Sequence, residues 1–343
     1  MPPVPRLEEV LAALAGKVVL CIEAKDGKAH APMMEMLESF KMMDAVMLKA
    51  SIGSPQLDMG RKLGLPLFGY LGSGADITAA AFDQAKVQLS GEQDALILPN
   101  RVSGMLLDDS SLGRAKQACP TVWVYSTHRR SEVDSYVRRG VVGFVSTCSG
   151  YTAGTISAVT APDWTGGIEP GLLTVDPYSD TYAIDWSGPP GSMTIGGLGK
   201  PAYVTLGEMG NVAATQWQLD LKARVVGGAP ASGDGPSVVA CTASDANPAV
   251  ESGTGYRAVW GLDGEVRIEE NTDRPRVLAS AMGTPPVGDD WHPIEVLVTP
   301  ESVDVVAGGV HISAADQRWR GGYVHLGCGE RAGKVAFAGV SRS

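Results

Sequence analysis

The pattern of apolar residues changes once along this 343-residue chain. Residues 1–155 alternate short apolar runs, which are typical of strands, with segments of helical periodicity, as βα units do. From residue 164 on, short alternating runs separated by turn residues follow one another without a good helix, which is typical of a β-sandwich. The sequence therefore predicts two domains, an α/β domain at 1–155 and an all-β domain at 164–343, joined by residues 156–163.

The first domain is predicted to hold about six βα units, counted from its apolar runs. These runs are short and rich in β-branched residues, and two of the helical segments end at Gly64 and Gly140. The predicted strands cover residues 18–25, 45–50, 65–71, 94–99, 121–126 and 141–147, and the predicted helices cover residues 7–14, 33–43, 56–63, 76–88, 107–118 and 131–139.

The first of these runs ends in an acid and a base, Glu23 and Lys25. On a strand, two residues that are two positions apart point to the same face. A carboxylate and an ammonium group side by side at a strand end can hold a metal ion and a phosphate together. The alternative is a strand that carries only a surface ion pair, and the local motif does not decide between the two.

Four segments of this domain form a recognisable series. Leu-Glu-Glu-Val-Leu at 7–11 precedes Ile-Glu-x-Lys at 22–25. Val-Trp-Val-Tyr-Ser at 122–126 is followed by a helical segment and by Gly-Val-Val-Gly-Phe-Val-Ser-Thr at 140–147. This series resembles the glycerophosphodiester phosphodiesterase family, and the resemblance implies the scaffold of a TIM barrel, in which eight parallel strands alternate with helices.

The resemblance also implies roles for individual residues. Glu23 would be a metal ligand on the strand of the third βα unit, and Lys25 would be a phosphate contact. The chain departs from the family at Tyr125, Val142 and Thr147, where the family usually has Trp, Asp and Asp. The scaffold is kept while polar positions near the ligand end differ.

The family's first two strands have no counterpart in this chain. They carry a His-Arg-Gly motif, the acidic residues that complete the metal site and a second catalytic histidine on an insertion. Ca²⁺ and Mg²⁺ want several oxygen ligands, so Glu23 alone cannot hold either cation. Either another polypeptide supplies two strands, or the barrel is incomplete and repurposed, and a divalent cation is implied only if the barrel is active. No histidine stands in a His-Arg-Gly context among His30, His128, His292, His311 and His325.

The second domain resembles the concanavalin A-like jelly rolls of the laminin-G or glucanase type. The resemblance rests on strand pattern, on a Leu-Asp-Gly hairpin signal at 262–264 and on a last strand at 335–340. It implies a module that binds glycans or serves as a spacer. The predicted strands cover residues 182–186, 202–206, 216–223, 256–260, 265–268, 294–298 and 303–306.

Tryptophans supply the candidates for glycan stacking in this domain. Trp260, Trp291 and Trp319 could each stack on a sugar ring, although packing is the more common role for Trp in an alternating strand, as for Trp217. The glucanase catalytic pattern Glu-x-Asp-x-x-Glu is absent from the sequence. The pairs Glu269-Glu270 and Asp289-Asp290 do not fit that pattern and are predicted to be solvated turns, and loop carboxylates show no calcium-site spacing.

Composition narrows the classes of partner. A net charge of −10 makes nucleic acid or an anionic membrane a poor expectation. No apolar run approaches the ~20 residues that span a bilayer, and the opening Met-Pro-Pro-Val-Pro-Arg does not have the pattern of a secretory signal. The cysteines are odd in number, form no Cys-x-x-Cys pair and are predicted to be reduced and buried: Cys21, Cys119, Cys148, Cys241 and Cys328.

Two functional hypotheses follow. A barrel fragment of this family fused to a concanavalin A-like domain looks like a minor tail protein of a phage that infects actinobacteria. The favoured hypothesis is a non-enzymatic virion tail protein that binds the host envelope, assembles as an oligomer with other tail or cell-surface subunits and contacts glycans or proteins through its jelly roll. The alternative is an extracellular or cell-surface, metal-dependent phosphodiesterase that acts on envelope glycerophosphodiesters, with the missing strands supplied by another chain.

Overall fold

The computed structural model describes most of the chain as two compact units. The first unit comprises Met1–Ser126 and Tyr136–Val145, and the second comprises Thr127–Ser135 and Ser146–Ser343. The predicted joint at 156–163, Thr147, Cys148 and Trp186 lie outside the described residues. The described residues are 4–102, 105–146, 149–154, 182–185, 188–197, 201–208, 216–227, 232–248, 253–329 and 332–342.

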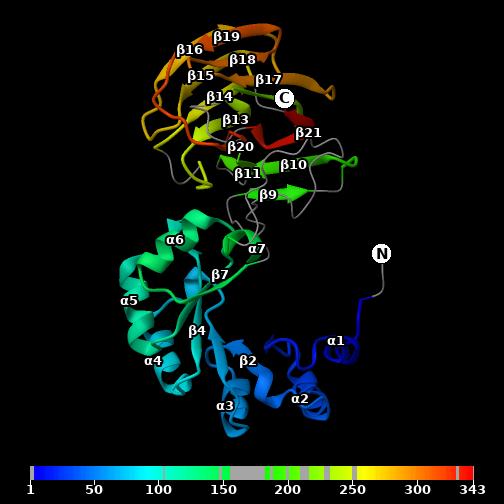
Figure 1. The fold of residues 1–343 in the computed structure, drawn as a ribbon, viewed down its shortest axis with the longest axis vertical. Helices are drawn as coiled ribbons and strands as arrows, with labels where there is room; N and C mark the ends of the chain where they lie inside the picture. Colours follow the sequence, from blue (N-terminus) through cyan, green and yellow to red (C-terminus); the bar gives the residue numbers. More distant parts are fainter. Residues whose placement is uncertain are drawn as a thin grey trace. The chain divides into compact units, whose positions relative to one another are not determined.

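The first unit is built on six parallel strands in the order β1-β2-β3-β4-β7-β8, which form a curled half-barrel (Figure 1). The register runs directly from each strand to the next in sequence, as in βα units. The strands are β1 (Leu20–Ile22), β2 (Val46–Ser51), β3 (Leu67–Tyr70), β4 (Ala95–Pro99), β7 (Val122–Tyr125) and β8 (Gly143–Val145), and the helices are α1 (Leu7–Leu14), α2 (His30–Ser39), α3 (Pro55–Lys62), α4 (Ala79–Gln88) and α5 (Asp109–Ala118). A further helix, α6 (Arg130–Arg138), belongs to this unit from Tyr136 on.

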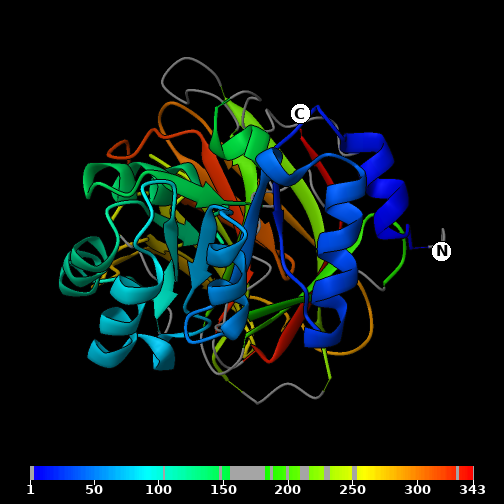
Figure 2. The same ribbon diagram turned by 90° about the horizontal axis from the view of Figure 1, so that it is seen from below.

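The helices lie along one face of this sheet (Figure 2). Alternate strand residues such as Leu48, Leu67 and Val122 point to that face and are fully buried in the main core of the unit. The opposite face carries a smaller apolar cluster, in which the Phe68 and Trp123 rings meet edge to face with their centroids 4.8 Å apart. The polar side chains at the strand ends continue this second face.

Capping residues explain where several helices begin. Ser54 accepts a hydrogen bond from the Gln56 backbone N–H at 3.2 Å, and Pro55 occupies the first turn of α3. Asp108 accepts from the Ser111 N–H at 2.7 Å at the start of α5. Just after α3, Gly64 has a φ of +73°, a backbone conformation that glycine adopts without strain.

The second unit is an antiparallel β-sandwich of two sheets, in the orders β19-β18-β17-β12-β21-β10-β9 and β11-β20-β13-β14-β15-β16. Figure 1 shows these strands in green to red. The strands are β9 (Tyr182–Asp185), β10 (Ser192–Gly197), β11 (Ala202–Glu208), β12 (Trp217–Val226), β13 (Asp234–Thr242), β14 (Tyr256–Gly261), β15 (Glu265–Glu270), β16 (Val277–Met282), β17 (His292–Val298), β18 (Val303–Ala307), β19 (Val310–Ala314), β20 (Tyr323–Cys328) and β21 (Lys334–Arg342).

One apolar core fills the sandwich. Alternate residues of both sheets contribute to it, among them Trp217, Val296 and Leu326, each at most 1% exposed. A core tryptophan of this kind stabilises strongly, since its removal typically costs about 3–5 kcal/mol. The predicted Asp263-Gly264 turn closes the β14–β15 hairpin, with Gly264 at a φ of +97°.

The fold class predicted from the sequence is confirmed: a partial barrel of βα repeats and an all-β sandwich. The boundaries differ, because β1 starts at Leu20 and leaves Val18 and Val19 exposed before it. The sequence patterns did not identify β10, β13, β16, β19 and β20, or the small hairpin of β5 (Arg101–Val102) and β6 (Met105–Leu106). None of the described helices is long and apolar enough to cross a membrane.

The cysteine prediction holds for three residues. Cys119, Cys241 and Cys328 are free and buried. Cys21 is free but exposed, contrary to the prediction, because it alternates with Leu20 and Ile22 and so points away from the helices. Strand alternation places every second residue of an apolar run on the other face.

Candidate functional site

Polar side chains gather at the carboxyl ends of β1, β2 and β3. We call Glu23, Lys25, Lys49 and Tyr70 the strand-end cluster. The Glu23 Oε1 atom lies 2.8 Å from Lys25 Nζ and accepts from the Tyr70 hydroxyl at 2.9 Å. The Glu23 Oε2 atom accepts from Lys49 Nζ at 2.8 Å. The predicted proximity of Glu23 and Lys25 is therefore present as an ion pair.

The electrostatics of this cluster keep Glu23 ionised. Burial raises the pKa of Glu23, but hydrogen bonds from Lys25, Lys49 and Tyr70 outweigh it, and the net pKa is lowered. Lys25 is 77% exposed and its pKa is raised by the hydrogen bond to Glu23, while burial and Glu23 raise the pKa of Tyr70. Glu23 thus pairs with two ammonium groups, and its single negative charge balances one of them.

This arrangement does not suit the divalent cation that the family resemblance implies. Both oxygens of Glu23 are engaged, and two of their partners, Lys25 and Lys49, are positively charged. Within the described ranges, no group of three or more His, Cys, Asp or Glu side chains is placed to hold a metal ion. The roles of Glu23 as metal ligand and Lys25 as phosphate contact stay predictions.

An open cleft of about 660 Å³ lies next to Tyr70 in the same unit. Its polar lining includes Asp76 and Thr78 near the start of α4, and Gln84 within that helix. No lysine or arginine is among the described residues that line it. The two lysines of the strand-end cluster are therefore directed at Glu23 rather than at this cleft.

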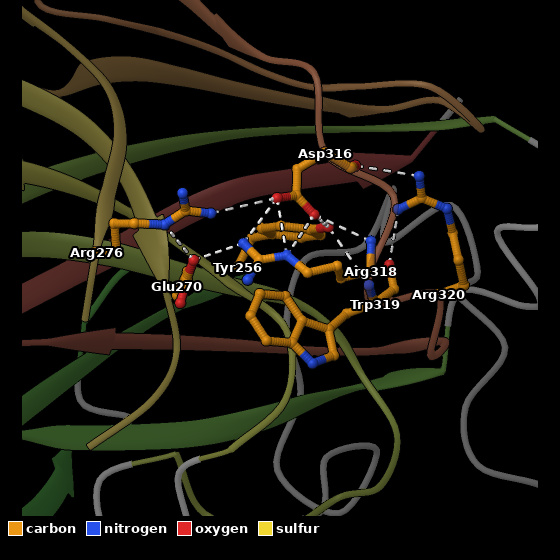
Figure 3. A network of polar contacts seen from close by, with 7 residues as sticks. All are labelled: Tyr256, Glu270, Arg276, Asp316, Arg318, Trp319 and Arg320. Atoms are coloured by element: carbon orange, nitrogen blue, oxygen red, sulfur yellow. Dashed lines mark hydrogen bonds and ion pairs between the residues drawn. The ribbon is translucent and has the colours of Figure 1, made fainter. Parts of the chain in front are cut away.

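A denser polar network occupies one end of the sandwich (Figure 3). Its members come from the first residue of β14, the last residue of β15, the residue before β16 and the loop between β19 and β20. Pairing of β14 with β15 sets Tyr256 opposite Glu270, which starts the network. We call it the loop cluster, and it consists of Tyr256, Glu270, Arg276, Asp316, Arg318, Trp319 and Arg320.

Asp316 is the centre of the loop cluster. Its Oδ1 accepts from the Tyr256 hydroxyl at 2.7 Å and from the Arg318 backbone N–H at 3.0 Å. Its Oδ2 accepts from Arg318 Nε at 2.9 Å and Nη2 at 2.7 Å, a bidentate contact. These partners fix the guanidinium plane of Arg318 against the Trp319 ring, 4.7 Å from the ring centroid.

Glu270 joins two arginines. Its Oε1 accepts from Arg276 Nε at 2.7 Å and from Arg318 Nη2 at 2.5 Å. Arg320 completes the cluster by donating to backbone carbonyls, at 2.8 Å to Trp319 and at 2.7 Å to Pro300. Two guanidinium groups are thus held next to each other by one carboxylate oxygen.

Burial within the loop cluster separates acids from bases. The side chains of Glu270 and Asp316 are 11% and 14% exposed, whereas those of Arg276 and Arg318 are 63% and 45% exposed. Hydrogen bonds from Arg318 lower the pKa of Asp316 and, together with those from Arg276, the pKa of Glu270. Burial and Asp316 raise the pKa of Tyr256 to about 12. The guanidinium groups therefore face the solvent in fixed positions, and the ionised carboxylates lie beneath them.

The three candidate tryptophans have different surroundings. Trp260 is 3% exposed and donates to the Thr284 carbonyl at 2.9 Å, so it belongs to the core. Trp291 is half-buried and carries the Arg224 guanidinium 4.8 Å above its ring. Trp319 is half-buried, meets Tyr256 edge to face at 5.1 Å and alone of the three lies in the loop cluster. Trp217 packs in the core at 1% exposed.

One expectation about acidic residues is wrong and one is confirmed. Glu269 and Glu270 are not solvated turns: they end β15 and are buried. Glu269 is stabilised there by Arg257 at 2.5 Å and Arg267 at 2.9 Å. Asp289 and Asp290 are exposed between strands, as predicted.

Most of the loop cluster was not predicted from the sequence. Trp319 was a candidate, but Arg276, Asp316 and Arg318 were not. A signal was present: Asp-x-Arg-Trp-Arg at 316–320 concentrates basic residues next to an aromatic one in an otherwise acidic chain.

Comparisons with known proteins find distant similarity to solved structures, over about half of the chain. No protein-family model matches the chain, and no curated protein matches it. The carbohydrate-binding module CBM66 from Bacillus subtilis is similar to 48% of this chain over 92% of its own length, with 15% identity and a TM-score of 0.33. A Bacillus subtilis protein of unknown function with a galectin-like fold covers 47% of this chain and 86% of its own, with 7% identity and a TM-score of 0.34.

A further similar structure is alginate lyase A1-II′, a member of polysaccharide lyase family 7. It covers 48% of this chain and 83% of its own, with 16% identity and a TM-score of 0.32. With identities and TM-scores this low, the ligand of this chain has to be inferred from its own side chains.

Proposed function

We propose that this chain is a non-enzymatic binding protein whose β-sandwich binds a glycan at the loop cluster. The observation that carries the proposal is the setting of Trp319, a half-buried indole surrounded by exposed guanidinium groups that buried carboxylates hold in place. Sugars present an apolar C–H face and a rim of hydroxyl groups. A binding site for them needs an aromatic surface and a few fixed polar groups, and the loop cluster contains both.

Preorganisation supports a binding role. Arg318 is held by Asp316 and Glu270 and packs on Trp319, so its donors are already oriented before a ligand arrives. Ordering a long side chain on binding costs about 0.5–1.5 kcal/mol, and a guanidinium that is already fixed avoids most of that cost. The cluster therefore resembles a prepared binding surface more than a set of mobile surface charges.

The wider role we propose is host-envelope binding as a subunit of a virion tail, with a bacterial cell surface as the alternative location. This part rests on the sequence resemblance to phage tail proteins. The half-barrel would then act as a docking scaffold for other subunits, which fits a Glu23 carboxylate that is paired with Lys25 and Lys49. Mass spectrometry of purified particles tests the location, and absence of the chain from them would leave only the cell-surface alternative.

Two matched variants of the full chain test glycan binding. Trp319→Ala removes the aromatic surface of the loop cluster, and Trp291→Ala removes a half-buried tryptophan that an arginine also covers, at another place in the sandwich. Loss of an aromatic stacking contact is expected to weaken glycan binding about tenfold or more in the first variant. Binding by the second variant should stay within about twofold of the parent chain.

Isothermal titration against oligosaccharides chosen from a glycan array is the measurement. Failure of the parent chain to bind any glycan would reject the proposal. A loss confined to Trp291→Ala would instead assign binding to the surface around that tryptophan, which the sequence also named.

A further inference from the structure

We infer that the glycan bound at the loop cluster is anionic, and that its carboxylate or phosphate group is held between Arg276 and Arg318. This inference rests on the proposed function and adds the chemical class of the ligand. Guanidinium groups match both anions with paired N–H donors, so the two anions share one recognition chemistry.

A ligand at the loop cluster would meet guanidinium groups before carboxylates. The carboxylates of the cluster are turned inward, at 11% exposed for Glu270 and 14% for Asp316, while Arg276 and Arg318 are 63% and 45% exposed. A neutral sugar would use carboxylates and guanidinium groups alike as hydroxyl partners. Here the acceptors are covered and the donors are presented, which favours a ligand that supplies acceptors.

Arg276 and Arg318 also have N–H donors that the cluster does not use. Each guanidinium has five N–H donors. Arg276 uses Nε on Glu270 and directs Nη2 to Asp316 at 3.9 Å, and Arg318 uses Nε and Nη2 on the two carboxylates. Among the described residues, the Nη1 groups of these two arginines have no hydrogen-bond partner. Both groups are available to a ligand.

The local charge of the loop cluster is positive. Arg276 and Arg318 share one oxygen of Glu270, so two like charges stand close together. Arg320 adds a third guanidinium that donates to backbone carbonyls, against two carboxylates in the cluster. In a chain with a net charge of −10, this is a cationic site in an acidic protein. A bound anion would act as a further counter-ion for the paired guanidinium groups.

The test compares an acidic glycan with its neutral form on the full chain. Oligogalacturonate and its methyl ester have the same backbone, and a phosphorylated mannan supplies the other anion. We expect the acid to bind about tenfold or more tightly than the ester, because a charge-assisted hydrogen-bonded contact is lost on esterification. Its affinity should also fall as salt is raised.

Variants show which arginine causes the difference in affinity between the acid and the ester. Arg276→Gln should lower affinity for the acid about tenfold and affinity for the ester by a smaller factor, while Arg276→Lys should bind the acid more tightly than Arg276→Gln does. Arg224→Gln is the control, since Arg224 also stacks on a tryptophan but lies outside the loop cluster. Circular dichroism of each variant checks that it is folded.

The outcomes separate the two claims. Equal binding of acid and ester would overturn the anionic inference and leave glycan binding intact. Binding of the phosphorylated mannan alone would keep the anionic class and assign phosphate as the anion. No binding by any glycan, charged or neutral, would overturn both.

Discussion

The strand-end cluster and the loop cluster combine the same kinds of group in opposite ways. At the strand ends one carboxylate, Glu23, is the shared partner of Lys25, Lys49 and Tyr70, and both of its oxygens are engaged. In the loop cluster the carboxylates lie beneath, and Arg276 and Arg318 are presented to solvent. At the strand ends, both lysines converge on one acid. In the loop cluster, two largely buried acids orient the arginines, whose guanidinium groups face the solvent.

The difference follows from the chemistry of the two bases. The lysine ammonium is a compact charge on a flexible stem, so it closes onto the nearest carboxylate. The arginine fork donates from several positions, so Arg318 can bind Asp316 and Glu270 and keep a further face available. The comparison predicts that the loop cluster binds ligand and that the strand-end cluster stabilises the half-barrel.

The largest expected effect lies outside both clusters and concerns the pH dependence of stability, through a histidine buried in the sandwich. His325 is fully buried between Thr205 and Thr242, and burial lowers its pKa well below the ordinary value near 6.5. The unfolded chain therefore takes up a proton that the folded chain does not. The contribution of neutral His325 to the free energy of unfolding is fully present above pH ~6.5. Below that pH, the free energy of unfolding should fall by about 1.4 kcal/mol per pH unit.

Urea denaturation followed by tryptophan fluorescence from pH 7 to pH 5 measures this loss. His325→Gln should remove this part of the slope. An unchanged slope in that variant would assign the acid sensitivity to other groups, among them His128, whose pKa burial lowers to about 4.

Removing the central acid of the loop cluster is the next largest effect. Asp316→Asn should destabilise the sandwich by about 2 kcal/mol, because hydrogen bonds to a largely buried charge are lost and Arg318 keeps only Glu270 as a counter-ion. It should also weaken glycan binding, since the Arg318 plane is no longer fixed. Chemical denaturation and titration calorimetry measure both.

Asp304→Asn is the matched control for that variant. Asp304 is similarly buried, at 17% exposed, but its partners are the Ser302 hydroxyl at 2.6 Å and His311 at 3.4 Å. Its loss is expected to cost about 1 kcal/mol and to leave binding unchanged. Equal effects of the two variants on glycan binding would contradict the role given to the loop cluster.

A smaller effect is expected at the strand ends. Glu23→Gln should cost about 1 kcal/mol, because Lys49 loses a partly buried partner. Neither the parent chain nor the variant should release glycerol phosphate from a simple glycerophosphodiester in the presence of Ca²⁺ or Mg²⁺. Metal-dependent release by the parent that disappears in Glu23→Gln would reverse the comparison and restore the phosphodiesterase hypothesis.

The smallest effect is expected from charge alone at the other arginine-covered tryptophan. Arg224→Gln removes the cation over Trp291, a contact of about 0.5–1 kcal/mol at a partly exposed site. Thermal unfolding should shift by only a few degrees. A large loss of glycan binding in this variant would show that a second cation–tryptophan pair takes part.

The sequence predicted the half-barrel well because most of its strands are apolar runs. It also predicted that Glu23 and Lys25 lie side by side, although β1 ends at Ile22 and the two residues follow the strand rather than lie on it. Lys49 and Tyr70 join from neighbouring strands, and their approach depends on the register of parallel strands, which no local pattern encodes.

The loop cluster was harder to foresee for the same reason. Glu270 looks like a solvated acid in a polar stretch, and only its pairing opposite Tyr256 and near the β19–β20 loop buries it. Residue type alone does not distinguish a packed tryptophan from a partly exposed one. Trp260 lies on a core-facing strand, whereas Trp319 lies in a loop.

The most direct test of the central claim is hydrogen exchange on the full chain with and without oligogalacturonate. If the loop cluster is the binding site, amides in residues 270–276 and 316–320 should exchange more slowly with the glycan bound, while residues 20–25 and 46–51 should not change. Slower exchange at the strand ends, with none in the loop cluster, would contradict it.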